Sequence, residues 1–273
     1  MATINTNPGA MIALQNLNKT NSELQTVQQR INTGLAISSA KDNGGIYAIA
    51  QSMRSDVGGY RAITQSLDLA ASTTDVALAA GEAISDLLVE MKEKALAGGD
   101  SSLDTASRSA LNEDFKALRD QIGTIVANAE FNGKNLINNG GTDLTVITSV
   151  NGSTMTVQAE DLSLTGGTLT ITAGTEFATA TDAQNVVVDI EDSLDNLNEA
   201  LARMGTGSKA IAINKTFVGK LSDALEKGIG NLVDADLAKE SARLQSLQVK
   251  QQLGIQALSI ANSAPSSILG YFR

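Results

Sequence analysis

The sequence predicts a mainly α-helical fold, a long-helix coiled-coil or bundle rod with a small β-hairpin insert and with the termini paired as an α-helical coiled coil. Three observations predict it. Apolar residues recur at every third or fourth position through most of the chain, the period changes to two in one central stretch, and apolar stripes lie near both ends. Because only 3% of the residues are aromatic, small aliphatic side chains must form the core.

The N-terminal helix is predicted by a heptad seam in which most positions are Leu or Ile. Its apolar members are Leu14, Leu17, Leu24, Ile31 and Leu35. Pro8 suits the first turn of such a helix, and Gly34 suits the left-handed conformation at its end. We therefore expect one helix with a single apolar stripe.

The C-terminal helix carries two apolar stripes. Val249, Leu253 and Ile260 follow one stripe, and Leu244, Leu247 and Leu258 follow the other. Pro265 is expected to end the helix and to leave residues 266–273 as an apolar tip. The N-terminal helix can cover only part of so wide a face, so we predict that all these residues, with the N-terminal stripe, form an assembly interface with neighbouring copies or another partner.

The middle of the chain predicts three further helices and two hairpins. The 3/4 spacing runs through residues 63–95, ending near Gly98, through 111–129 after N-cap candidates at 102–104, and through 187–229. Between them, about residues 142–173, the period is two. We expect one hairpin around Asn151-Gly152 with a type I′ turn, and a second around Gly166-Gly167.

Composition excludes most chemistry. The 273 residues include no Cys and no His, so thiol and imidazole catalysis are excluded, and we expect no enzyme, no cofactor, no metal and no catalytic residue. The acidic group Asp189, Glu191, Asp192 and Asp195 suits the start of a helix better than a metal site. Residues 205–209 (Gly-Thr-Gly-Ser-Lys) superficially resemble a phosphate-binding loop. They lack the glycine–lysine spacing of that motif, and no predicted strand precedes them.

Charge is distributed unevenly along the chain. The net charge is −10, which argues against binding to nucleic acid. Residues 1–40 contain only Lys19, Glu23 and Arg30 as charged side chains, and residues 244–273 only Lys250 and Arg273. No stretch is apolar enough for membrane insertion, and the N-terminus lacks the pattern of a cleavable Sec signal. The nearly uncharged ends suit surfaces that become enclosed.

Several segments resemble bacterial flagellins, in order and over essentially the whole chain. They are Ile4 to Asn7, Gln29 to Leu35, Ser39 to Gly45, Glu130 to Leu136, Val233 to Glu240, and Gln252 to Arg273. The amino-acid sequence of these segments is similar to that of short alphaproteobacterial flagellins such as those of Caulobacter. The resemblance implies a structural subunit of the flagellar filament that self-assembles through its terminal helices into a hollow helical polymer for swimming motility.

The resemblance also implies domains, partners and location. Residues 1–40 and 233–273 would be the two halves of an inner coiled-coil domain, and residues 41–232 the outer rod domain. Expected partners are further copies in a homopolymer, the flagellar cap and hook-associated proteins, the export chaperone and the type III export apparatus, and the expected location is the extracellular filament. A hook-filament junction protein and a type III secretion needle or translocator component stay open as alternatives.

Overall fold

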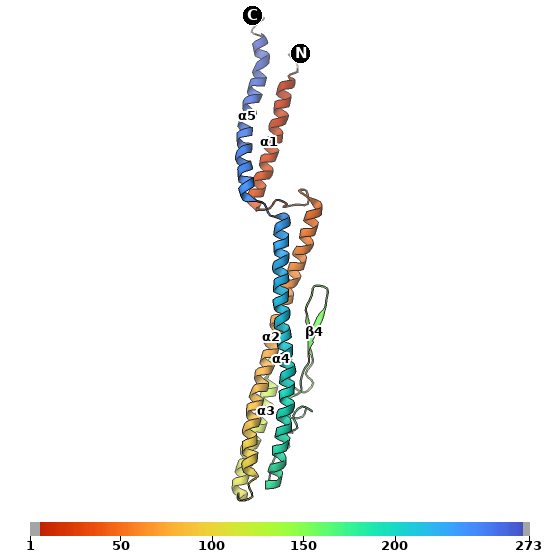
Figure 1. Cartoon of the computed structure of the whole chain (residues 1–273), viewed down its shortest axis with the longest axis vertical. Coiled ribbons are helices and arrows are strands. Elements are labelled where there is room, and N and C mark those ends of the chain that lie inside the picture. Colours follow the sequence, from red (N-terminus) through yellow and green to blue (C-terminus); the bar gives the residue numbers. More distant parts are fainter. Residues whose placement is uncertain (1–5, 270–273) are drawn as a thin grey trace. The chain divides into compact units, whose positions relative to one another are not determined.

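The computed structural model describes residues 6–269 of the chain, with side chains up to residue 263 at its C-terminal end (Figure 1). Five helices contain most of these residues: α1 (Pro8–Thr33), α2 (Gly44–Gly98), α3 (Thr105–Asn128), α4 (Ala180–Val233) and α5 (Leu237–Leu269). Four short strands, β1 (Glu130–Phe131), β2 (Lys134–Asn135), β3 (Leu144–Ile147) and β4 (Thr154–Val157), form two antiparallel hairpins. The mainly α-helical prediction with a small hairpin insert is confirmed.

Contacts divide the chain into two compact units. We call Met1–Val57 with Ala224–Arg273 the terminal unit, and Gly58–Asp223 the central unit. In the terminal unit α1 and α5 lie side by side and antiparallel (Figure 1). The pairing of the two ends, predicted from their apolar stripes, is therefore confirmed.

The core of the central unit lies among α2, α3 and α4 and the segment that follows β4. Phe115 and Phe177 meet edge to face with ring centroids 5.4 Å apart. Leu88, Ile122 and Ile190 are fully buried beside them. Gly81 lets α4 approach α2 closely, because a Cβ there would overlap the side chain of Leu201. The small size of this residue is therefore needed for the contact between the two helices.

Helix ends follow local chemistry at three of the predicted places. Asn7 caps α1 with a hydrogen bond from the Ala10 N–H, Gly34 adopts a left-handed conformation after α1, and Asp104 caps α3. The prediction that Pro265 ends the last helix is wrong, since α5 continues to Leu269. A proline lacks only one backbone donor, so a helix can continue beyond it at a local cost. The predicted apolar tip, residues 266–273, lies outside the described side chains.

The hairpin predicted around residue 151 is confirmed, but its turn differs. β3 and β4 pair with Leu144 opposite Val157 and Ile147 opposite Thr154. Gly152 has a positive φ and Asn151 does not, so the turn is not type I′. Two successive positive φ angles occur instead at Asn132 (50°) and Gly133 (78°), which connect β1 and β2. An Asn-Gly pair thus signals a tight turn without specifying its type.

The second predicted hairpin, around Gly166-Gly167, is wrong. Residues 162–171 contain no strand, because their backbone donors bond to other parts of the central unit. The N–H of Leu162 donates to the Ile137 carbonyl, and the N–H groups of Thr170 and Ile171 donate to Ser193 Oγ. The alternating apolar residues serve as anchors in the core of this unit, and Leu162 and Ile171 are fully buried.

Candidate assembly surface

Polar contacts set the register of α1 against α5. Asn7 Nδ2 donates to the Ala261 carbonyl over 2.6 Å, and Gln251 Nε2 donates to Asn21 Oδ1 over 2.8 Å. Leu17 lies against Gly254, where a Cβ would be 3.2 Å from its Cδ1 atom. Amide side chains therefore align the two helices, which agrees with ends that carry few charges.

An ion pair lies at the other end of these helices. Arg30 Nη1 is 3.2 Å from Glu240 Oε1, and the Glu240 side chain is only 11% exposed. Arg30 Nε and Glu240 Oε2 are buried without a hydrogen-bond partner. Breaking the pair would leave a charge that is mostly excluded from water.

Backbone contacts join the segments that follow α1 and precede α5. The N–H of Ala36 donates to the Val233 carbonyl, and the N–H of Ala235 donates to the Gly34 carbonyl. In the same connector the Asp42 carboxylate accepts hydrogen bonds from Ser39 and Ser38, and their backbone N–H groups, Ser39 first, lower the pKa of Asp42.

The predicted interface residues divide into two groups by exposure. Leu247 is buried within the terminal unit (3% exposed), and Leu17, Leu24, Ile31, Leu35, Leu244 and Leu258 are partly buried. In contrast, four predicted residues are about half exposed or more: Leu14, Val249, Leu253 and Ile260. The stripe with Leu247 thus packs within the chain, and the stripe with Val249 remains uncovered in a single copy.

Sequence reasoning missed four apolar residues of these two helices. Val27 is buried at 2%, whereas the heptad position between Leu24 and Ile31 falls on the next residue, Gln28. An α-helix has 3.6 residues per turn, so its contact face drifts away from a 3.5-residue repeat. Met11, Ile12 and Ile255 are more than half exposed, and Met11 lies three positions before Leu14, where an extended stripe would have included it. A hollow of about 410 Å³ lies along this face of α1, between Pro8 and Asn18.

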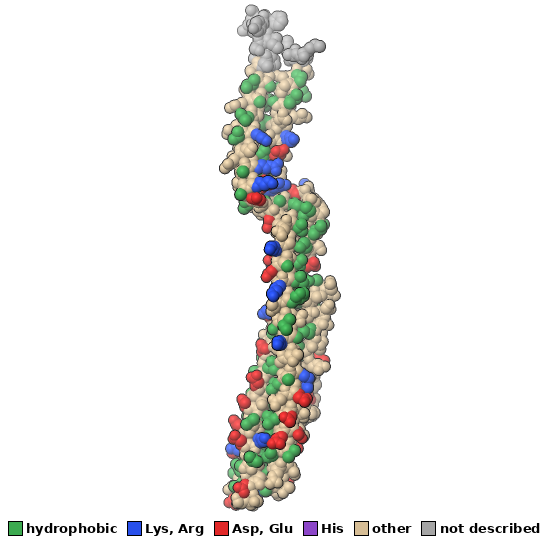
Figure 2. All heavy atoms as spheres, in the orientation of Figure 1, with side chains coloured by type: hydrophobic (Ala, Val, Ile, Leu, Met, Phe, Trp, Pro, Cys, Tyr) green, Lys and Arg blue, Asp and Glu red, His purple; other side chains and the backbone are tan. Residues whose placement is uncertain are grey.

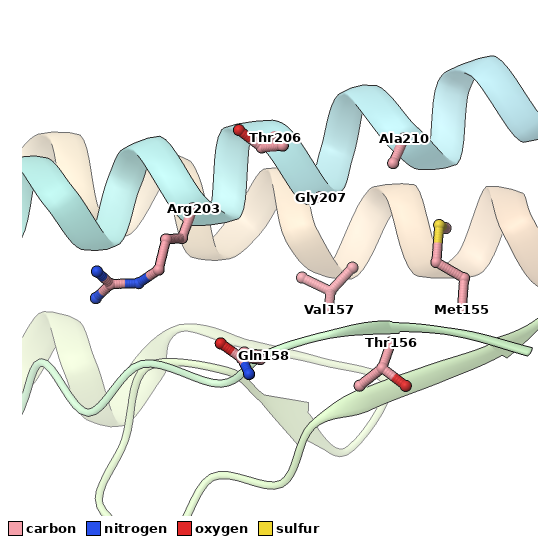
Figure 3. A pocket seen from close by; sticks show the side chains of 8 residues that line it. All are labelled: Met155, Thr156, Val157, Gln158, Arg203, Thr206, Gly207 and Ala210. Atoms are coloured by element: carbon pink, nitrogen blue, oxygen red, sulfur yellow. The ribbon is translucent and has the colours of Figure 1, made fainter.

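A second surface feature lies between β4 and α4 (Figure 3). A groove of about 350 Å³ is lined by residues 155–158 and by one face of α4 from Arg203 to Ala210. Met155 and Val157 point toward the helix, where a Cβ on Gly207 would lie 2.9 Å from the Val157 side chain. Because Gly207 has no Cβ, the hairpin can pack closely against α4 at this position. Residues 205–209, which superficially resemble a phosphate-binding loop, lie inside a continuous helix.

Neither a metal-binding cluster nor a membrane-spanning helix is found among the residues that the structure describes. No group of three or more Asp or Glu side chains in this part of the chain is arranged to hold a metal ion. None of its helices is long and apolar enough to cross a membrane.

Comparisons with known proteins agree with these features. The profile of the bacterial flagellin N-terminal helical region matches residues 4–142, and that of the bacterial flagellin C-terminal helical region matches residues 187–272. Flagellin FljK of Caulobacter vibrioides is 56% identical over 270 residues, which are 99% of this chain and 98% of that protein. A flagellin of Brucella melitensis is 38% identical over the whole of both chains.

Solved structures share the fold. A putative flagellar hook-associated protein from Vibrio parahaemolyticus superposes with a TM-score of 0.57 at 16% identity, covering 71% of this chain and 100% of that one. The Bacillus cereus flagellin has a TM-score of 0.50 at 21% identity, covering 56% of this chain and 88% of its own. At such identities they show the fold alone, whereas the two profile matches and the close relatives show that this chain belongs to the bacterial flagellin family.

Proposed function

We propose that this chain forms its filament by burying, between neighbouring copies, the apolar residues that α1 and α5 leave exposed. As a flagellin it is a structural subunit of the extracellular flagellar filament, a homopolymer that serves motility. We also propose which residues make this contact, where the domains begin and end, and which partners other than copies of itself the chain binds.

The observation that carries the proposal is the uncovered apolar stripe. Ile260 is 71% exposed, Leu253 is 59% and Val249 is 56%, and on α1 Met11 and Ile12 are similarly exposed. Burial of apolar surface favours association by roughly 25 cal/mol per Å², from which the cost of lost translational and rotational freedom is subtracted. The ends of the chain carry few charges, so little desolvation opposes their enclosure.

We also propose residues 1–40 and 233–273 as the two halves of the inner domain, and residues 41–232 as the outer domain. The connector after α1 and the one before α5 support these limits, because the bridge between Leu35 and Asp234 lies outside the helices. Cap and hook-associated proteins, an export chaperone and the type III export apparatus are proposed partners, and the absence of enzymatic activity belongs to the same proposal.

Seeded growth tests the interface. Leu253→Asp should leave the helicity and thermal unfolding of the monomer unchanged, because this side chain is exposed in one copy, and should prevent growth on native filament fragments. Gln252→Asp is the matched control, since the neighbouring residue is polar and exposed and carries the same added charge. Normal filaments from Leu253→Asp would contradict the proposed interface.

The same assay separates the alternatives that the sequence left open. A subunit of the filament grows into long polymers from seeds, whereas a hook-filament junction protein ends a polymer after few copies. Relatives that are flagellins along their whole length do not favour the junction or needle alternatives. Failure of the native chain to elongate seeds would favour them instead.

A further inference from the structure

Asparagine precedes glycine at four places in this chain, and the fold restrains the four pairs to different degrees. The pairs are Asn43-Gly44, Asn132-Gly133, Asn139-Gly140 and Asn151-Gly152. Asparagine is a thermolabile residue, and a following glycine has no side chain to hinder attack of its own peptide nitrogen on the asparagine side chain. The attack requires that the glycine N–H and the asparagine carboxamide are both free to move toward each other.

In two of the pairs one reacting group is held by a hydrogen bond. The Gly152 N–H, which would supply the attacking nitrogen, donates to the Ser149 carbonyl over 3.0 Å. The Asn139 carboxamide donates through Nδ2 to Thr165 Oγ1 over 3.3 Å. Each of these bonds must break before ring closure, so both pairs are protected.

The pair before α2 is held by the helix itself. Asn43 Oδ1 accepts a hydrogen bond from the Ile46 N–H over 3.2 Å, which is the arrangement of a helix N-cap. Gly44 is the first residue of α2, so the helical turn fixes its backbone. Rotation of the Asn43 side chain onto the Gly44 nitrogen would break this cap.

The fourth pair, Asn132-Gly133, lies in the short turn between β1 and β2. Among the residues that the structure describes, none makes a hydrogen bond to the Asn132 side chain or to the Gly133 N–H, and both residues are exposed. Two residue pairs make up the β1–β2 hairpin, and so small a hairpin opens at little cost. Asn132 also has a φ of 50°, a conformation that is disfavoured for a residue with a side chain.

We propose that Asn132-Gly133 is a self-modification site, at which the chain loses ammonia with water as the only co-reactant. The Gly133 nitrogen forms a bond to Asn132 Cγ, and the bond between Cγ and Nδ2 breaks. Nδ2 leaves as ammonia and takes the proton that the Gly133 nitrogen gives up, so that a five-membered cyclic imide remains. Water then opens the imide: addition at Cγ gives aspartate, and addition at the backbone carbonyl gives isoaspartate, in which the main chain runs through Cγ.

The two products change the central unit in different ways. Aspartate adds one negative charge to a unit that has 23 acidic and 11 basic side chains. Figure 2 shows how acidic side chains gather over the lower part of this unit, so the new charge adds to an existing repulsion. Isoaspartate also adds one main-chain atom to a two-residue turn, so β1 and β2 lose their register.

Loss of this register reaches the core. Directly after the turn, Asn135 Nδ2 donates to the Val126 carbonyl of α3 over 2.7 Å. Leu136 and Ile137 follow and are fully buried. The converted fraction therefore increases with the age of the chain, and conversion loosens the contact between this segment and α3.

Peptide mapping of the aged chain tests the site. The full chain is kept at mildly alkaline pH and digested at intervals with proteases that place each pair in its own peptide. Chromatography and mass spectrometry then separate the amide, aspartate and isoaspartate forms. Asn132 should convert about three- to tenfold faster than the other three asparagines, the factor that one lost hydrogen bond supplies. In guanidinium chloride the four rates should lie within about threefold of one another, because the fold no longer distinguishes the pairs.

Two variants connect the reaction to the fold. Asn132→Gly removes the reacting carboxamide and keeps the turn, because glycine adopts a positive φ without strain. On ageing it should keep the thermal midpoint of the fresh protein, whereas the native chain should lose stability as Asn132 converts. Asn151→Gly is the matched control, since it removes a carboxamide from a pair whose attacking nitrogen is bonded, and it should age as the native chain does.

Equal conversion of all four pairs in the folded chain, or faster conversion at Asn151, would overturn the proposal. The same holds if aged Asn132→Gly loses as much stability as the aged native chain. These measurements do not depend on polymerisation, so their failure would leave the proposed assembly through α1 and α5 intact. Failure of fresh native chain to elongate seeds would refute that assembly and leave the rates at Asn132 unchanged.

Discussion

The α1–α5 pair and the central unit differ in how much apolar surface each buries within one copy. In the central unit, large side chains such as Phe115, Phe177 and Leu88 are fully buried. Among the described apolar side chains of α1 and α5, Val27 and Leu247 alone are buried, and long ones such as Ile260 are exposed. Two helices in contact along one line cannot cover wide apolar faces, whereas three helices and their connections can enclose a core.

The packing of the central unit is therefore complete within one copy, whereas that of the α1–α5 pair is not. The central unit has the core and satisfied polar groups of an independent structure, for example Ser193, whose hydroxyl serves two backbone donors and one acceptor. The α1–α5 pair leaves apolar side chains exposed in one copy, and under the proposed interface a second copy covers them. Substitutions in the two regions should therefore separate loss of assembly from loss of folding.

The largest effect is expected from Leu247→Asp. An unpaired carboxylate in this buried position costs more than the roughly 2–5 kcal/mol of a buried Leu→Ala truncation, so the α1–α5 pair should separate and filaments should not form. Hydrogen exchange should show loss of protection in α1 and α5 and unchanged protection in the central unit. Leu247→Met conserves volume and should assemble; loss of protection throughout the chain would remove the distinction between the two regions.

Phe115→Ala should weaken the other region. Removing this fully buried ring, and its contact with Phe177, should lower the free energy of unfolding of the central unit by about 3–5 kcal/mol. Urea unfolding followed by circular dichroism measures the change. Phe217→Ala is the matched control, because that ring is 59% exposed, and it should change stability by less than about 0.5 kcal/mol. Equal effects of the two substitutions would contradict the assignment of Phe115 to the core of the central unit.

Arg30→Met tests the ion pair of the terminal unit. It leaves the largely buried Glu240 carboxylate without its partner and should destabilise the α1–α5 pair by about 1–3 kcal/mol, after allowance for the partial exposure of Arg30. The double variant Arg30→Met with Glu240→Leu should recover most of the loss, because no buried charge remains. Hydrogen exchange of α1 measures both, and a double variant weaker than the single one would contradict this explanation.

Two glycines of α4 should respond in opposite directions. Gly205→Ala meets no atom within 4 Å and should stabilise the helix by up to about 1 kcal/mol. Gly207→Ala meets Val157 and should come out about 1–2 kcal/mol less stable than Gly205→Ala, because the hairpin must shift. Thermal unfolding of the two variants gives the difference, and identical values would show that the hairpin does not need this glycine.

The smallest effect concerns pH. Hydrogen bonds from the Ser107 side chain and then from its backbone N–H lower the pKa of the Asp104 carboxyl below 3.8. A lowered folded-state pKa stabilises the fold at pH values above the unfolded-state pKa. This contribution is lost as the pH falls through the folded-state pKa. Thermal midpoints of the native chain should thus fall more steeply between about pH 5 and about pH 2 than those of Asp104→Asn, whose cap does not titrate. Parallel curves would contradict this role of Asp104.

Local patterns in the sequence were sufficient to predict the helices and the apolar stripes of α1 and α5. The 3/4 spacing identified all five helices, because a face that must be buried repeats with the helical period. Asp104 and Gly34 could be predicted as helix ends, since their roles depend on neighbouring backbone atoms. The stripe of Leu253 and Ile260 was identified for the same reason of periodicity.

Contacts between residues distant in the sequence decided the features that local patterns did not predict. Residues 162–171 alternate as a strand would, yet they bond to Ser193 and to the Ile137 carbonyl, which no local pattern reveals. Two stripes on α5 were visible in the sequence, but only packing against α1 shows that Leu247 is buried and Val249 is not. Periodicity along the chain was thus enough to identify the apolar faces, because that depends only on the helical repeat. The tertiary structure decided which of those faces one copy covers, because that depends on the elements that meet it in space.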